Sequence, residues 1–424
     1  MFFFVNTVGY IWGHIGLLVH SNQLTKSEQN VAMKLLLLFL LVVLHHSNSE
    51  EHSHDYSVSN RHLAKNVYTE LAKKSPDNLI FSPLSLQLIL TLTRFGAKGH
   101  TEEELQKGLG LSSDLGVVKQ SVKDLLANLT GNKPYTVVTA NKVYIKEGYP
   151  VKSSFKDIAK NIFLADIENV DFSKKEEAAE KINKYVEEKT ENLIKNLIKA
   201  EQLDKLTRML LINTLYFKAN WSHQFDEDET SIQKFSKSPT ESLKVSLMRH
   251  VNFYRYGEIP ELDAKVLQVP YKGNEVFLTI ILPNKVDGLA HIQQNLEKAL
   301  EPRDLKIHQV ELQFPKFKME SDVKLKPLLK NLGIKDLFDD SKADLSGIAP
   351  PEPRLYAKDV FQKVYIKFTE SGTTAATATA IILGVPMSSH PPVPTPFIVD
   401  HPFFFYISKD NFVFFAGHVT KPEI

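Results

Sequence analysis

The sequence contains no cysteine among its 424 residues. This absence excludes disulfide bonds, cysteine-based zinc sites, iron–sulfur clusters and a thiol nucleophile. An excess of charge of one sign is also lacking, because 51 Lys and Arg residues stand against 50 Asp and Glu residues. Neither nucleic acid nor an anionic membrane surface is therefore an expected partner. The fold must depend on the packing of the hydrophobic residues, which make up 43% of the chain.

Several motifs that carry chemistry are missing as well. The sequence has no G-x-S-x-G nucleophile elbow, no H-E-x-x-H zinc motif, no Walker loop and no dinucleotide fingerprint. Four of the histidines cluster between residues 45 and 54: His45, His46, His52 and His54. They straddle an expected cleavage region, so we do not expect them to hold a metal ion. Neither an enzymatic activity nor a cofactor is predicted.

Two apolar stretches open the chain, and only the second is uninterrupted. It runs from Leu35 to Leu44, directly after Met33-Lys34, and small and polar residues follow it. This pattern is typical of a secretory signal peptide, and the stretch is too short to span a bilayer. We expect residues 1–32 to be an upstream extension, residues 33–49 to be a cleaved signal peptide, and the chain to be secreted. An uncleaved anchor is the alternative.

In a secreted chain, the N-x-S/T sequences are candidate glycosylation sites. Asn128 lies where an amphipathic helical pattern gives way to Gly131, which is an exposed kind of position. Asn220 lies between Phe217 and Trp221 in an apolar run. The sequence therefore predicts a glycan on Asn128 and none on Asn220.

Residues 50–424 contain no flexible linker and no internal repeat, which predicts a single domain. Apolar residues in its first half keep the three-to-four spacing of helices: Leu63, Val67 and Leu71, then Leu84, Leu88 and Leu92, then Ile182, Tyr185, Val186, Leu193, Ile194 and Leu197. The second half has runs of β-branched and aromatic residues: 276–283, 310–319, 364–369, 402–408 and 412–419. Helices first and strands later predict an α+β protein with mainly antiparallel sheets.

The most unusual composition lies between Ser371 and Ala380, where no residue is charged or larger than threonine. The segment follows a strand-like run and precedes a proline-rich stretch, Pro386 to Pro396, that cannot join a central sheet. Small side chains with alternating threonines suit a segment that can enter a sheet between existing strands. The plainer interpretation is a flexible linker of alanine and threonine.

Four stretches, in this order along the chain, resemble the serpin family. They begin at Asn78 (NLIFSPLS), Leu211 (LINTLYFKANW), Glu370 (ESGTTAATATA) and Phe397 (FIVDHPFFFYI). The resemblance covers the chain from about Asp55 to its end, and it is to secreted inhibitors such as those of insect haemolymph. It implies a serpin fold, with helices packed around three mainly antiparallel β-sheets and an exposed reactive loop at about residues 370–396.

The resemblance also implies a mechanism. A serine protease attacks the exposed loop as a substrate, and the cleaved loop inserts as a new strand of the central sheet, which distorts the enzyme in a covalent one-to-one complex. The hinge of that movement matches Glu370, Gly372, Thr373, Ala375, Thr377 and Thr379. The last four would be buried, and none is charged or bulky, so we expect a monomeric inhibitor. The alternative is a non-inhibitory relative that carries a ligand or acts as a chaperone.

The cleaved bond is expected near Met387. The sequence Pro386-Met387-Ser388 is similar to the reactive site of inhibitory serpins, which implies cleavage between Met387 and Ser388. The usual count from Glu370 falls one residue earlier, after Pro386, and Leu383–Gly384 is a further option. Because proline is a poor residue for cleavage, we prefer Met387–Ser388. A flexible apolar Met fits an elastase- or chymotrypsin-like pocket and does not suit a trypsin-like one.

Further positions match residues that control the central sheet in serpins. Ser82, Ser85 and Asn213 match a polar cluster beneath the sheet, called the shutter, and Trp221 matches a residue at its top, called the breach. Core packing or helix capping is the plainer interpretation of each. Gln362 stands where many members have a histidine of the shutter. An amide also donates and accepts hydrogen bonds, but the pH dependence of a histidine is lost.

Overall fold

The computed structural model describes Lys34 and residues 55–75, 77–373 and 393–423. The chain divides into two compact units, residues 1–54 and residues 55–424. Apart from Lys34, every described residue belongs to the second unit, so the expected extension and signal peptide lie outside the described part. Within the described ranges, no helix combines the length and the apolar character that a membrane crossing requires.

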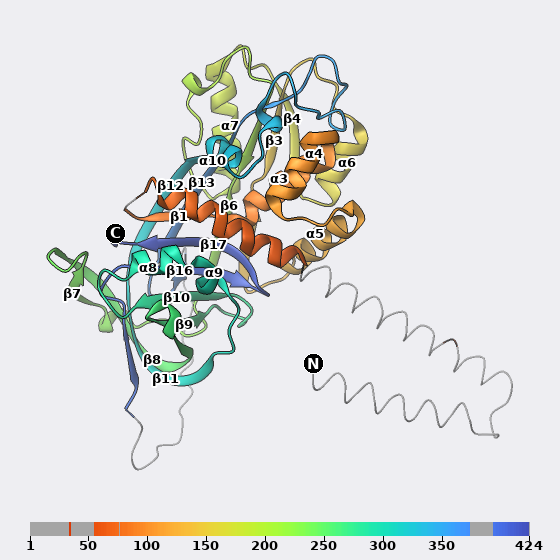
Figure 1. The fold of residues 1–424 in the computed structure, drawn as a ribbon. Coiled ribbons are helices and arrows are strands. Elements are labelled where there is room, and N and C mark those ends of the chain that lie inside the picture. Colours follow the sequence, from red (N-terminus) through yellow and green to blue (C-terminus); the bar gives the residue numbers. More distant parts are fainter. Residues whose placement is uncertain (1–33, 35–54, 76, 374–392, 424) are drawn as a thin grey trace, which may run out of the picture. The chain divides into compact units, whose positions relative to one another are not determined.

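Helices fill most of the first part of the second unit (Figure 1). Residues 55–72 are helical. The other described helices are α3 (Pro83–Gly96), α4 (Gly99–Leu109), α5 (Leu115–Leu129), α6 (Ser153–Asn161), α7 (Lys175–Lys189), α8 (Leu289–Gln294), α9 (Leu296–Leu300) and α10 (Lys326–Asn331), with 3-10 turns η1 (Ala200–Gln202), η2 (Glu227–Glu229), η3 (Pro260–Leu262) and η4 (Asp336–Phe338). The expected helical pattern around Leu193 and Leu197 is wrong for its last turns. Glu191 and Asn192 take positive φ angles of 51° and 61°, which end the helical path.

The described strands form two hydrogen-bonded sheets. The nine-stranded sheet contains β1 (Leu79–Phe81), β17 (Phe412–Val419), β16 (Phe403–Lys409), β10 (Phe277–Pro283), β9 (Ala264–Pro270), β8 (Ser242–Ile259), β11 (Lys306–Pro315) and β15 (Thr395–Ile398) in that order, with β7 (Ser231–Ser236) paired to β8. The eight-stranded sheet contains β2 (Tyr135–Thr139), β6 (Leu215–Asn220), β14 (Gly372–Thr373), β13 (Ala357–Phe368), β5 (Met209–Asn213), β3 (Lys142–Lys146) and β4 (Asp166–Val170), with β12 (Phe317–Lys324) paired to β13.

The predicted α+β class with mainly antiparallel sheets is confirmed. Among the described strand pairs, only β3 with β4, β5 with β13, and β11 with β15 are parallel. Two of the three sheets implied by the resemblance are continuous here because β8 is 18 residues long. Its earlier part pairs with β7 and β11, and its last residues pair with β9.

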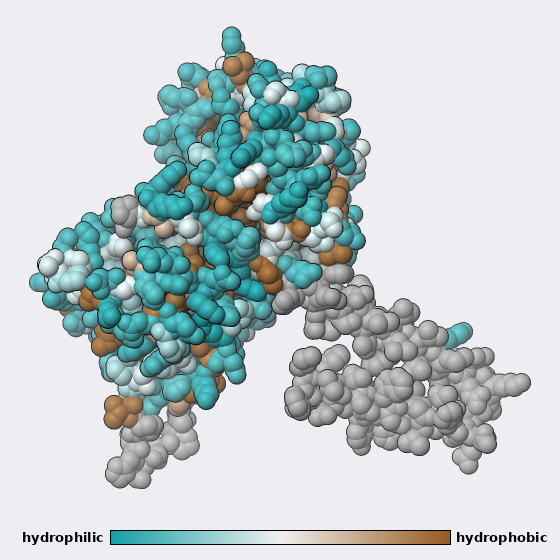
Figure 2. Space-filling model, in the orientation of Figure 1, coloured by the Kyte–Doolittle hydropathy of each residue, from teal (hydrophilic) through white to brown (hydrophobic). Residues whose placement is uncertain are grey.

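The core lies between the two sheets. Phe217 of the eight-stranded sheet contacts Phe414 and Phe415 of the nine-stranded sheet, with ring centroids 6.3 and 6.4 Å apart. Phe368 and Phe405 make a similar edge contact at 5.7 Å. The face of the molecule in Figure 2 is mostly hydrophilic, with scattered hydrophobic residues. Burial between the sheets therefore accounts for the aromatic runs of the second half of the sequence.

Candidate functional site

The chain turns back on itself immediately after β13. Thr373 of β14 lies opposite Phe368, the last residue of β13, in an antiparallel pair. The amide of Thr369 donates to the carbonyl of Gly372 at 2.9 Å, and the amide of Gly372 donates to the carbonyl of Thr369 at 3.2 Å. The first residues of the small-residue segment are thus held as a strand.

This short strand lies between two longer ones. On the side away from β13, Gly372 pairs with Asn220 and Thr373 pairs with Ala219 of β6. At this end of the sheet, β14 therefore separates β6 from β13, whereas further along β13 pairs directly with β5 as far as Gln362. The eight-stranded sheet thus holds one extra strand at this end, and beyond it β13 and β5 pair with each other directly.

Gly372 is required at its position by close approach of the backbone. A Cβ atom added there would lie 2.1 Å from the carbonyl oxygen of Ala219 and 2.6 Å from the Cα of Asn220. Its φ of 153° is also one that side-chain-bearing residues rarely adopt. The glycine therefore lets β14 lie against β6.

Thr373 points beneath the sheet. Its exposed fraction is 0%, and its Oγ1 lies 2.6 Å from the hydroxyl oxygen of Tyr271, which is also fully buried. Burial raises the pKa of Tyr271, so the phenol stays neutral and can donate or accept in this hydrogen bond. The site beneath the sheet thus accommodates a small polar side chain and provides it with one partner.

Trp221 closes the same end of the sheet. Its ring stacks on Tyr271 with centroids 4.5 Å apart and lies parallel to Phe368 at 6.3 Å. The indole Nε1 donates to the carbonyl of Thr369 at 2.9 Å, and the backbone amide donates to the carbonyl of Ser371 at 3.0 Å. Trp221 therefore contacts the turn between β13 and β14 through both its side chain and its backbone.

Glu370 in the turn is buried and paired. Its carboxylate lies 2.8 Å from the ammonium group of Lys316 and accepts a hydrogen bond from Thr230 at 3.1 Å. Burial acts to raise the pKa of Glu370, but the hydrogen bonds from Lys316 and Thr230 outweigh it and hold that pKa below its ordinary value. The turn is thus fixed by an ion pair as well as by packing.

Replacing Lys316 with methionine is expected to weaken this pair in a pH-dependent way. The carboxylate of Glu370 would stay buried without its cation, which should lower the free energy of unfolding at pH 7 by about 1–3 kcal/mol. Because the pKa of Glu370 is lowered in the native protein, the stabilisation is present above its ordinary pKa and is lost as the pH falls through the lowered value. Urea unfolding between pH 7 and pH 3 measures the difference.

The difference in the free energy of unfolding between the native protein and Lys316→Met should therefore become smaller as the pH falls towards 3. Lys316→Arg, which keeps the positive charge, serves as the control and should retain most of the stability at pH 7. A difference that stays constant over this pH range would show that Lys316 acts through its packing and not through Glu370.

The four residues matched to the shutter lie together beneath the point where β5 and β13 pair. Ser82 is the N-cap of α3, and its backbone amide donates to the side-chain oxygen of Gln362 at 2.9 Å. Gln362 Nε2 donates to Asn213 Oδ1 at 2.5 Å and to the carbonyl of Ser82 at 2.9 Å. Ser85 Oγ donates to the same oxygen of Asn213 at 3.0 Å. All four are fully buried.

The glutamine thus uses both ends of its amide in this cluster. Asn213 extends the network further, because its Nδ2 donates to Asn141 Oδ1 at 3.0 Å. Ser82 Oγ also donates to the carbonyl of Phe414 in β17, at 2.7 Å. The cluster therefore links the helix α3, the eight-stranded sheet and the nine-stranded sheet.

Other expected site residues fall outside the described part of the chain. They are Ala375, Thr377 and Thr379 of the hinge, and Met387 and Ser388 of the expected reactive bond, all within 374–392.

The two candidate glycosylation sites are both described. Asn128 is exposed in the last turn of α5, where its Nδ2 donates to Asp410 at 3.1 Å and its Oδ1 accepts from Lys409 at 3.0 Å. Asn220 is half-buried in β6.

Four residues of the site were not found by sequence reasoning: Tyr271, Lys316, Thr230 and Asn141. Each lies more than 50 positions from its partner in the hinge or in the polar cluster. The sequence offers one weak indication, because Lys316 interrupts the apolar alternation where the run 310–319 divides into β11 and β12. The others belong to no motif.

The site defines a class of protein in which the chain segment that follows β13 begins as an added strand of the eight-stranded sheet. Comparison with known proteins agrees, since residues 58–422 match the family Serpin (serine protease inhibitor). Alaserpin of Manduca sexta is 34% identical over 86% of this chain and 93% of its own length. Antichymotrypsin-2 of Bombyx mori is 33% identical over 84% and 96%.

Serpin48 of the insect Tenebrio molitor has a solved structure that is 39% identical, covers 87% of this chain and 98% of its own, and superposes with a TM-score of 0.81. The chain belongs to the serpin family. It is therefore placed among serine protease inhibitors and not among enzymes, and the predicted serpin fold is confirmed.

Proposed function

We propose that the protein is a secreted suicide-substrate inhibitor of elastase- or chymotrypsin-like serine proteases. The observation that carries the proposal is the strand β14, whose two residues lie between β6 and β13. Cleavage of the reactive loop would free the chain beyond Thr373 to extend this strand. The protease, still bound as an acyl-enzyme to the cleaved loop, would be dragged along with it.

The energy available to such an insertion is large enough for the task. Roughly ten to fifteen new ladder hydrogen bonds at about 0.5–1.5 kcal/mol each give a net gain on the order of 10 kcal/mol. This is comparable to the whole stability of an ordinary domain, about 5–15 kcal/mol. Insertion can therefore offset the distortion of a protease active site.

The specificity part of the proposal depends on Met387, which is medium-sized, flexible and apolar. Such a side chain enters the primary pocket of elastase- or chymotrypsin-like enzymes without the need for an opposite charge. Antichymotrypsin-2 carries a name consistent with this class. We propose Met387–Ser388 as the cleaved bond.

Incubation with neutrophil elastase and with chymotrypsin tests this function. We expect a denaturant-resistant one-to-one complex on electrophoresis and a released carboxyl-terminal peptide that begins at Ser388, measured by mass spectrometry. Trypsin provides the comparison and should form little complex. Cleavage without a complex by every enzyme in the panel would contradict the proposal.

Secretion and glycosylation belong to the same proposal. The exposed position of Asn128 at the end of α5 is compatible with a glycan, and the half-buried Asn220 inside β6 is not. Expression in insect cells, with enzymatic removal of N-linked sugar and peptide mapping, should place the glycan on Asn128. The mature chain should begin near residue 50.

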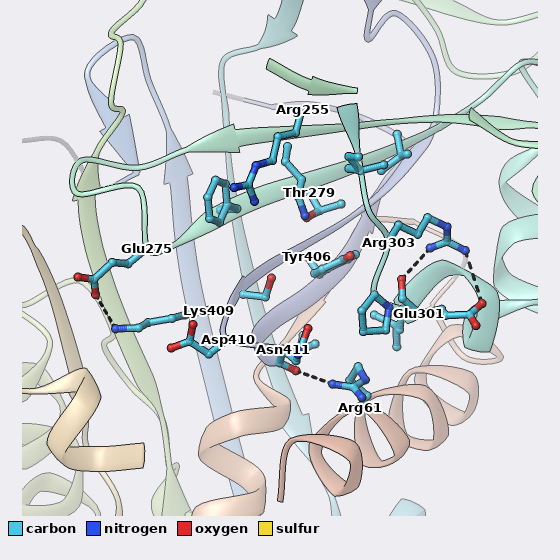
Figure 3. A pocket seen from close by; sticks show the side chains of 18 of the residues that line it. Arg61, Arg255, Glu275, Thr279, Glu301, Arg303, Tyr406, Lys409, Asp410 and Asn411 are labelled. Carbon is cyan, nitrogen blue, oxygen red and sulfur yellow. Dashed lines mark hydrogen bonds and ion pairs between the residues drawn. The ribbon is translucent and has the colours of Figure 1, made fainter. Parts of the chain in front are cut away.

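A second candidate function, ligand carriage, is favoured by one pocket. Its volume is about 480 Å³, and the side chains of Arg61, Arg255 and Arg303 project around it (Figure 3). Arg61 donates to the carbonyl of Asn411, and Arg255 lies 4.9 Å from the ring centroid of Phe277. Among the described residues, Arg255 forms no ion pair with a carboxylate. Glu275, Glu301 and Asp410 also line the pocket, but Glu301 pairs with Arg303 and Glu275 pairs with Lys409. Arg255 beside Phe277 is therefore the feature that suits a small molecule with an anionic group and an aromatic ring.

An anionic aromatic dye, 8-anilinonaphthalene-1-sulfonate, tests this candidate. Its fluorescence should increase on binding to the protein, and Arg255→Gln should weaken binding by about tenfold through the loss of one charge-assisted contact. Arg208→Gln, outside the pocket, is the control. Equal binding by all three proteins would exclude this pocket as the ligand site.

A further inference from the structure

A histidine and two carboxylates meet where α4 approaches η4. His100 and Glu104 lie one helical turn apart on α4, and Asp336 is the first residue of η4. His100 Nδ1 lies 2.6 Å from Asp336 Oδ2 and 3.7 Å from Glu104 Oε1. One potential metal-binding atom from each residue lies within 4.8 Å of the other two. This cluster is remote in sequence from the hinge and has no part in the proposed inhibition.

The carboxylate of Glu104 is already oriented. Its Oε2 accepts hydrogen bonds from the backbone amides of Lys335 and Asp336, each at 2.7 Å. These two bonds hold the carboxylate in place and leave Oε1 on the side of His100. In established metal sites, such hydrogen bonds to the second oxygen fix ligating carboxylates in the same way.

The cluster is exposed mainly through His100. The side chain of Asp336 has an exposed fraction of 12%, whereas that of His100 has 67%. A bound ion would therefore be held from within the protein by the carboxylates and would keep a coordination position for water on the side of His100.

The ligand types favour a transition metal ion over Ca²⁺ and Mg²⁺. Imidazole nitrogen together with carboxylate oxygen suits Zn²⁺, at metal–ligand distances of about 2.0–2.2 Å, whereas Ca²⁺ and Mg²⁺ prefer oxygen ligands alone. Tetrahedral geometry places the ligand atoms about 3.3 Å apart, so His100 and Asp336 would separate slightly and Glu104 would approach. The two carboxylates balance the charge of the ion. We propose that His100, Glu104 and Asp336 form a Zn²⁺ site that ties α4 to η4.

Cobalt(II) absorption and equilibrium dialysis with Zn²⁺ test the proposal on the untagged mature protein. We expect one Co²⁺ per chain with visible absorption bands that Zn²⁺ abolishes, and a rise in the unfolding temperature of roughly 2–4 °C at saturating Zn²⁺. His100→Ala should weaken Zn²⁺ binding at least about tenfold and remove the rise in unfolding temperature. His308→Ala, at an exposed histidine of β11, is the matched control and should leave binding unchanged.

Asp336→Asn separates metal binding from the structural contact. The asparagine keeps a hydrogen-bonding partner for His100 but loses the charge, so the apoprotein should stay folded while Zn²⁺ binding falls. Binding by His100→Ala that equals binding by the native protein would place the metal elsewhere, for example on His52 and His54, and would overturn the proposal. Absence of Zn²⁺ binding by the native protein at 100-fold molar excess would overturn it as well.

Discussion

Arginine in place of Thr373 is expected to convert trapped protease complex into cleaved and released chain. The native side chain is fully buried, and its hydroxyl lies 2.6 Å from that of Tyr271. An arginine there would place a positive charge beneath the sheet without an opposite charge, at a cost of about 3–5 kcal/mol. Because Thr373 already lies in β14 before cleavage, this cost falls on the uncleaved protein as well and should drive β14 out from between β6 and β13. Insertion would then have to bury the charge, and it would lose the competition with hydrolysis of the acyl-enzyme. The number of inhibitor molecules consumed per protease inhibited should rise by at least about tenfold.

The neighbouring residue provides a matched control. Because side chains alternate along a strand, Thr374 of the inserted loop would face solvent, so Thr374→Arg should still form the complex. Both variants should be cut at the same rate by the protease, since neither changes the bond. Full-strength complex formation by Thr373→Arg would show that insertion past this residue is not needed for inhibition.

Removal of the indole of Trp221 should produce the largest loss of stability at this end of the sheet. The ring is buried, stacks on Tyr271 and lies parallel to Phe368. Trp221→Ala leaves a cavity, and changes of this kind cost about 3–5 kcal/mol. The urea concentration at half-unfolding, followed by circular dichroism, should fall accordingly.

Trp221→Phe separates packing from hydrogen bonding. It keeps an aromatic ring against Tyr271 but removes the Nε1 donor to the carbonyl of Thr369, so we expect a smaller loss of about 1–3 kcal/mol. Equal unfolding midpoints for the alanine variant and the native protein would mean that the ring contributes no net packing energy.

The sequence was sufficient to predict the fold class and the place of the hinge. Local patterns carried these predictions, since the spacing of Leu84, Leu88 and Leu92 reports one helix face and the small residues after Glu370 report a segment fit for a sheet. The resemblance added the positions of Asn213 and Trp221. These are properties that a short stretch of chain shows on its own.

The remaining features of the site depend on contacts between distant parts of the chain. Tyr271 precedes Thr373 by 102 positions, and Lys316 precedes Glu370 by 54. Which tyrosine lies under the hinge, and which lysine neutralises its carboxylate, follows from the register of β13 against β12 and from the packing of one sheet on the other. The helix end near Thr190 was missed because the apolar spacing continues beyond it, while the left-handed backbone at Glu191 depends on local conformation.

The two paired residues of β14 bear on the kinetics of the proposed insertion. Formation of the first pair in a strand addition is the slow, entropically unfavourable nucleation event, because the chain must be ordered before it gains ladder hydrogen bonds. Gly372 and Thr373 have already met this requirement against both neighbours before any protease arrives. After cleavage, the loop would only propagate from a formed nucleus, one residue pair after another. Insertion of the loop would therefore compete with hydrolysis of the acyl-enzyme after its slowest step, nucleation of the strand, is already complete.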